Sequence, residues 1–165
     1  MTTNNVIRLL ESKKIPYTAF DLPVEKLGAI ETAQRLNVPL EQVFKTIVVM
    51  RDKPGKPVLA VVPGTAEVNL KGVASFLGEK KMHIPTLKEA ELITHLQAGG
   101  ISPLALLNKG FVVLLDKSAI QFETIHISGG QRGLNIRLPV AAFIELTQAQ
   151  LAVISTPSHS TSDQG

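Results

Sequence analysis

The chain has 165 residues, of which 44% are hydrophobic and 19% are charged, a balance typical of one soluble globular domain with a real core. Cysteine is absent, which excludes disulfides, thiolate metal sites and cysteine nucleophiles and suits a reducing, cytoplasmic setting. A net charge of +3 favours an anionic partner or simply a solvated basic surface, while signal-peptide and membrane-spanning patterns are absent from the sequence.

Helix signals and β-prone runs alternate along the chain. In the N-terminal part we predict a helix in TNNVIRLLESKK, a strand in IPYTAF, a helix over residues 30–36 that Asn37 ends, a helical turn in PLEQVF, and a hairpin of the buried strands KTIVVM and VLAVVP.

The C-terminal part continues the alternation. We predict a helix in LKGVASFL between Asn69 and Gly78, a strand in KKMHIP, and a helix with the capping box Thr86 and Glu89. A buried strand FVVLL and a helical turn over residues 117–122 follow. We then predict strands TIHIS and LNIRL around a glycine-rich turn, a helix after Pro139, and a segment LAVI packed on the core.

Short turns join several of the predicted strand pairs, which a purely parallel sheet would not allow. We therefore predict an α+β (mixed α/β) fold in a single domain over residues 1–154. Residues 155–165, rich in Ser and Thr, are predicted to form a disordered polar tail.

Lys45 stands where a polar turn becomes the apolar run TIVVM. A lysine at the mouth of a strand can rest its stem on apolar groups and aim its ammonium into a cleft, where it holds a phosphate or polarises an ester carbonyl. A lowered pKa would instead make it a base or an amine nucleophile. A solvated surface lysine is the ordinary alternative, so this segment alone leaves the role of Lys45 open.

Two glycine-rich turns are the other unusual segments, GGISP at residues 99–103 and SGGQRG at residues 128–133. Paired glycines let a ligand approach the main chain and can turn N–H groups inward, and Pro103 keeps Ser102 out of the helical region. SGGQRG is neither a Walker loop nor a dinucleotide fingerprint, because it lacks both required spacings. Arg132 could pair with phosphate or be solvated, so the turns predict a pocket without naming its ligand.

The sequence gives little support for a metal site or for a catalytic triad. The four histidines, His83, His95, His126 and His159, lack close ligand spacing. We expect no metal site, and nothing points to a Ser–His–Asp triad.

Together and in this order, QVFKTIVV, GGISPL and ISGGQRGLNI resemble the YbaK family of aminoacyl-tRNA deacylases, whose domain is shared with the editing insertion of bacterial prolyl-tRNA synthetases. The resemblance runs from about Val6 to Ile154. It implies a twisted, barrel-like mixed sheet surrounded by helices, and hydrolysis in trans of a mischarged tRNA, typically Cys-tRNA(Pro), without cofactor or metal. The implied partners are the acceptor end of that tRNA and prolyl-tRNA synthetase, with no membrane and no DNA.

The resemblance also implies roles for individual residues. Lys45 matches the family's essential lysine and is implied to be catalytic. The implied substrate-binding residues are Leu22, Leu27, Thr46, Gly99, Gly100, Ile101, Ser102, Ser128, Gly129, Gly130 and Asn135.

Asn135 is the main departure from the family pattern, since cysteinyl-tRNA deacylases usually carry Asp there. Asn keeps the size and hydrogen bonding of Asp but loses the charge that would fix the substrate's α-amino group. Leu22 and Leu27 likewise stand where aromatic residues occur in the family. The edited amino acid therefore stays open between cysteine and another such as alanine. A non-catalytic module that binds tRNA or a synthetase, and a lysine-dependent enzyme acting on a carbonyl compound, remain as further hypotheses.

Overall fold

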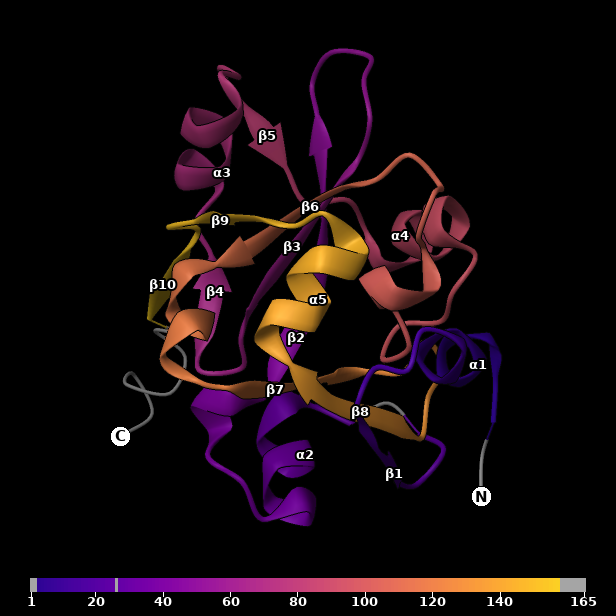
Figure 1. Cartoon of the computed structure of the whole chain (residues 1–165). Coiled ribbons are helices and arrows are strands. Elements are labelled where there is room, and N and C mark those ends of the chain that lie inside the picture. The colour runs from indigo at the N-terminus through magenta and orange to yellow at the C-terminus, as the bar shows by residue number, and fades with distance from the viewer. Residues whose placement is uncertain (1–2, 26, 158–165) are drawn as a thin grey trace.

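The computed structural model describes residues 3–25 and 27–157. Its largest sheet is mixed: β2 is antiparallel to β5 and β3, whereas β6 runs parallel to β3 and β9. Helices pack around this sheet and its neighbours (Figure 1), which confirms the predicted α+β class. In sheet order, the five strands are β5 (Met82–His83), β2 (Phe44–Arg51), β3 (Val58–Pro63), β6 (Val112–Asp116) and β9 (Gln150–Ala152).

Two smaller sheets complete the β structure. One has the antiparallel order β1-β8-β7, made by Thr18–Asp21, Leu134–Pro139 and Thr124–Ser128. The other pairs β4 (Ala66–Val68) with β10 (Ser155–Pro157). A single bridge between Val43 and His126 joins the three-stranded sheet to the residue before β2. The barrel-like sheet that we expected is thus divided into three.

Several helices begin or end at the capping residues that the sequence indicates, although the fourth ends at Thr94 and not at Leu96. Asn69 accepts a hydrogen bond from the main-chain N–H of Gly72 at 3.1 Å, and Thr86 and Glu89 form the predicted capping box. Asn37 is left-handed, with a φ of 56°, and ends the second helix as predicted. The helices are α1 (Asn5–Ser12), α2 (Ala29–Leu36), α3 (Leu70–Leu77), α4 (Leu87–Thr94) and α5 (Val140–Thr147), with 3-10 helices η1 (Leu40–Gln42), η2 (Pro103–Ala105) and η3 (Lys117–Gln121).

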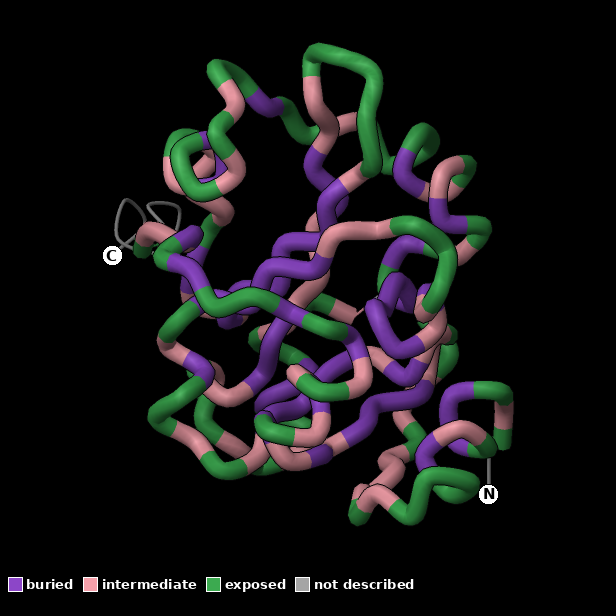
Figure 2. Tube along the Cα trace, turned by 45° about the horizontal axis from the view of Figure 1, so that its top comes forward, coloured by how far each residue is buried: buried purple, intermediate pink, exposed green. Residues whose placement is uncertain are grey.

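The five-stranded sheet is buried on both faces because side chains alternate along β2 and β3. Val48, Leu59 and Val61 belong to one apolar cluster, which also contains residues of α1, α5 and the three-stranded sheet. Val49 and Val58 belong to a second cluster with residues of α3. Figure 2 shows buried segments along the middle of the molecule and exposed ones around them. This rigid frame positions the start of β2.

The predicted polar tail begins too early. Ser155–Pro157 forms β10 and pairs with β4, because Ile154 is fully buried just before it and its N–H donates to the carboxylate of Asp116 at 3.1 Å. The rest of the predicted tail, residues 158–165, lies outside the described residues. Within the described ranges, every helix is too short or too polar to cross a membrane.

Candidate active site

A hollow of about 320 Å³ lies at the start of β2. Its walls come from β2, from α2 and the loop before it, from residues 98–101, and from the β7–β8 turn with the start of β8. Segments far apart in the sequence therefore meet here. The predicted site residues that line it are Leu22, Leu27, Lys45, Thr46, Gly99, Ile101, Ser128 and Asn135.

Four predicted substrate-binding residues do not line this hollow: Gly100, Ser102, Gly129 and Gly130. Ser102 is fully buried, and its hydroxyl accepts from the N–H of Leu104 at 3.2 Å, which caps η2. Gly129 packs closely on a β8 side chain, and Gly130 lines a different hollow. The contact of these four residues with a substrate stays a prediction.

Lys45 is half-buried at the start of β2. The edge strand β5 pairs with β2 only at Met50 and Arg51, so the first residues of β2 have an outer edge without a strand partner in the described structure. Burial lowers the pKa of Lys45, and the nearby carboxylate of Glu67 offsets part of this. No ion pair involving Lys45 occurs among the described residues. A half-buried ammonium without a direct ion-pair partner can attract a phosphate or an ester oxygen.

Thr46 contributes a second polar group to the wall of the hollow. Its hydroxyl oxygen is buried and has no hydrogen-bond partner in the described part of the chain. Buried hydroxyls are nearly always hydrogen-bonded, so Thr46 leaves an unpaired polar atom inside the wall, behind the surface of the hollow.

The two glycine-rich turns pack main chain against main chain. A Cβ added at Gly100 would lie 2.9 Å from the Cα of Gln131, which only glycine avoids. The Nε of Arg132 donates to the carbonyl of Ala98 at 2.6 Å, and the Ser128 hydroxyl donates to the Gly99 carbonyl at 3.4 Å. Arg132 therefore holds the two turns together, a role that the sequence did not reveal.

Asn135 lies opposite Ser128 in the β7–β8 register and is almost completely buried. Its side-chain oxygen is 2.9 Å from the Nδ1 of His126. Sequence reasoning considered His126 only as a metal ligand and missed this pairing, although the hairpin pattern puts both residues on one face of the sheet. In the described ranges, no three His, Asp or Glu side chains gather into a group suited to bind a metal.

Sequence reasoning also missed several lining residues. Glu25 is the one carboxylate among the described residues that line the hollow, and it lies in an irregular loop after Pro23 without a recognisable motif. Gly28, Ala29 and Thr32 line it from the first turn of α2 and its cap. A loop contact of this kind carries no periodic signal, so only the tertiary structure reveals it.

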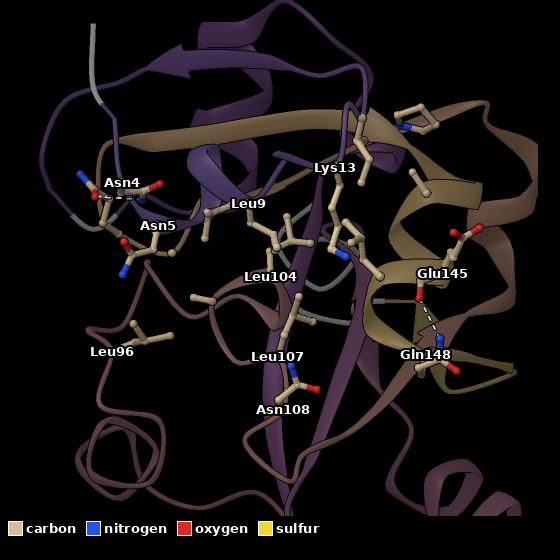
Figure 3. A pocket seen from close by; sticks show the side chains of 18 of the residues that line it. Asn4, Asn5, Leu9, Lys13, Leu96, Leu104, Leu107, Asn108, Glu145 and Gln148 are labelled. Atoms are coloured by element: carbon tan, nitrogen blue, oxygen red, sulfur yellow. Dashed lines mark hydrogen bonds between the residues drawn. The ribbon is translucent and has the colours of Figure 1, made fainter. Parts of the chain in front are cut away.

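A second hollow, of about 1240 Å³, lies between α1, η2 and α5 (Figure 3). Leucine and amide side chains dominate its walls, and Lys13 and Glu145 are its charged groups in the described structure. The amide of Asn4 donates to the carbonyl of Gly129 at 2.9 Å, so this hollow adjoins the SGGQRG turn from the other side. Because it lacks Lys45 and residues 98–101, we place the candidate site in the smaller hollow.

Comparisons with known proteins identify the family of the chain. The family of aminoacyl-tRNA editing domains matches residues 25–146, which include all three motifs. A proposed Cys-tRNA(Pro)/Cys-tRNA(Cys) deacylase of Enterococcus faecalis, EbsC, is 36% identical over 154 residues, covering 92% of this chain and 93% of that protein.

Solved structures show the same fold. The hypothetical protein APE2540 superposes with a TM-score of 0.83 at 19% identity, over 93% of this chain and 100% of the other. A proposed trans-editing enzyme for prolyl-tRNA synthetase gives a TM-score of 0.78 at 22% identity, over 94% and 99% of the two chains. With the family match covering most of its length, the chain belongs to the family of aminoacyl-tRNA editing domains.

Proposed function

We propose that the protein is an aminoacyl-tRNA deacylase that acts in trans, with Cys-tRNA(Pro) as its first candidate substrate. The observation that carries this proposal is the meeting of a half-buried Lys45 with two glycine-rich turns in one hollow of an editing-domain chain. The 36% identity to EbsC, which is itself a proposed deacylase of Cys-tRNA(Pro) and Cys-tRNA(Cys), supports the choice of substrate.

The size of the hollow fits the end of a charged tRNA. A volume of about 320 Å³ is near the lower end of the range for small-ligand sites. It suits the aminoacyl group and terminal ribose, while the acceptor stem stays outside, on a chain whose net charge is +3. Affinity for tRNA should therefore weaken with added salt. Since charged tRNA is the substrate, we place the protein's action in the cytoplasm, with prolyl-tRNA synthetase as a candidate partner.

The chemistry is ester hydrolysis. An attacking water adds to the ester carbonyl carbon, and negative charge develops on the carbonyl oxygen. The bond to the ribose oxygen then breaks as that oxygen takes up the proton given up by the water, which releases the amino acid and restores the ribose hydroxyl. The ammonium of Lys45 stabilises the carbonyl oxygen, and the Ser128 hydroxyl orients a polar group of the substrate. No histidine is among the described lining residues, so positioning and charge stabilisation carry the reaction in this proposal.

A panel of mischarged tRNAs tests the proposal. The purified protein is incubated with Cys-tRNA(Pro), Ala-tRNA(Pro) and Ser-tRNA(Pro), with correctly charged Pro-tRNA(Pro) as the control. We expect release of at least one mischarged amino acid, cysteine first, and slower release of proline. If the protein binds these tRNAs but hydrolyses none of them, it is a binding module and the proposal is wrong.

A further inference from the structure

One face of the three-stranded sheet carries a row of polar and aromatic side chains next to the hollow. Ser128 pairs with Asn135, and His126 pairs with Arg137, so the antiparallel register puts all four on the same face. Phe20 pairs with Asn135 from the other side and belongs to this face too. Ser128 and Asn135 line the hollow, whereas His126 does not and is fully buried.

His126 is held firmly behind Asn135. The ring of Phe20 lies 5.5 Å from its ring, centroid to centroid, and Arg137 stacks over Phe20 at 5.6 Å. The main chain of His126 is fixed by its bridge to Val43. The imidazole therefore has one fixed neighbour for its Nδ1, the Asn135 side chain at 2.9 Å.

The other ring nitrogen decides which way the Asn135 amide faces. The Nε2 of His126 is buried and has no hydrogen-bond partner among the described residues. If the amide NH₂ of Asn135 donated to Nδ1, the ring proton would sit on Nε2 as a buried donor without an acceptor, an arrangement that proteins rarely tolerate. If the proton is instead on Nδ1, the Nδ1–H donates to the Asn135 oxygen, and Nε2 carries only a lone pair without a partner.

Burial lowers the pKa of His126, and the positive charge of Arg137, which lies opposite it in the strand register, lowers it further, so both disfavour a doubly protonated ring. In the neutral ring with its proton on Nδ1, the Asn135 oxygen is engaged and its NH₂ group makes no hydrogen bond with the described residues. Unlike the Nε2 of His126, this unpaired nitrogen is not fully buried, and Asn135 lines the hollow. The NH₂ group is therefore free to meet a ligand.

We propose that His126 is a positioning residue that turns the NH₂ group of Asn135 into the hollow, so that the site offers a hydrogen-bond donor at this point. The substrate has to present an acceptor there. On the proposed function, which this step uses, the acceptor is an oxygen of the aminoacyl ester or of the terminal ribose. The α-ammonium of the substrate, which has only donors, is held elsewhere.

The orientation can be tested without any activity. Long-range ¹H–¹⁵N correlation spectra of the ¹⁵N-labelled wild-type protein at neutral pH report which ring nitrogen of His126 carries the proton, with the assignment made by its loss in His126→Phe. We expect a proton on Nδ1 and none on Nε2. A proton on Nε2, alone or in a doubly protonated ring, would overturn the proposal.

The kinetic consequence is measured on the deacylation reaction. Replacing His126→Phe keeps a ring beside Phe20 but lets the amide rotate, so we expect KM to rise roughly three- to ten-fold with kcat nearly unchanged. Replacing His126→Gln restores a donor and should recover part of the affinity. An unchanged KM in folded His126→Phe, with the fold checked by circular dichroism, would overturn the role of His126. If the wild type hydrolyses no aminoacyl-tRNA, the proposed function fails, and the spectra still decide the orientation.

Discussion

The contact between the two glycine-rich turns offers a sharp test of how the hollow is built. In Gly100→Ala, the new Cβ would lie 2.9 Å from the Cα of Gln131, 3.0 Å from its carbonyl carbon and 3.1 Å from the nitrogen of Arg132. All three atoms belong to the main chain and cannot rotate away. Carbon atoms in contact are about 3.5–4.0 Å apart, so the turns have to separate by roughly 0.6–1 Å.

This separation should cost both stability and activity. Overpacking of this kind destabilises by about 1–3 kcal/mol, and a displacement near 1 Å at a reacting group can slow catalysis roughly 100-fold. We expect urea unfolding to show a loss in that range and kcat/KM for deacylation to fall at least about ten-fold. The control is Ser75→Ala, at an exposed position of α3 away from the hollow, where stability and kcat/KM should stay near the wild-type values. Wild-type stability and kcat/KM in Gly100→Ala would refute the reasoning.

Three further predictions follow from charges in and behind the hollow. Burial keeps the pKa of Lys45 below its ordinary 10.5, so between the lowered pKa and 10.5 the unfolded chain binds more protons and wild-type stability should rise with pH. In Lys45→Met this rise should be absent and the free energy of urea unfolding at neutral pH should be higher than in the wild type. A lower stability at neutral pH would contradict this prediction. Burial, aided by Arg137, keeps the pKa of His126 below 6.5, so stability that is present above that pH is lost as the pH falls through the lowered pKa. The variant His126→Phe should therefore lose less stability than the wild type between neutral pH and about 5, as measured by urea unfolding. If the carboxylate of Glu25 contacts the α-amino group of the substrate, Glu25→Gln should raise KM roughly three- to ten-fold for a mischarged tRNA with a free α-amino group. It should not raise KM for the N-acetylated form, since only the free amine is charged. Equal effects on both substrates would exclude this contact.

Local signals in the sequence predicted most of the elements. The Asn69 cap with its Gly78 end and the Thr86–Glu89 capping box lie within a turn of the helices that they bound, so their hydrogen bonds need no distant partner. The apolar runs of β2 and β3 likewise predicted a hairpin, because both faces of these strands are buried. For such segments, the local preference and the tertiary structure agree.

The short strands were not predictable in the same way. β4 and β10 have three residues each and exist because Ser155 pairs with Val68, which lies far away in the sequence. The composition of the C-terminal segment is polar and indicates a tail, yet the buried Ile154 brings it to a free strand edge. Long-range pairing overrode the local signal there.

The candidate site was predicted as a set of motifs but not as a geometry. The three motifs meet in one hollow, and Lys45 lies in its wall. The structure separates residues that line the hollow from those that support it: Ser102 caps a helix, and Arg132 ties one turn to the other. Hydrogen bonds between segments more than thirty residues apart leave no trace in spacing or periodicity. The role of Asn135 depends on its bond to His126, which only the sheet register brings within reach.

The most direct test of the central claim is single-turnover hydrolysis of Cys-tRNA(Pro) by the wild type, by Lys45→Ala and by the surface control Lys53→Ala. Loss of a group that stabilises charge in the transition state costs roughly 100- to 1,000-fold in rate. We expect a loss of that size in Lys45→Ala, with the fold and tRNA binding preserved, and wild-type rates in Lys53→Ala. Equal rates in all three proteins would contradict the assignment of this hollow, and of Lys45 within it, as the site of deacylation.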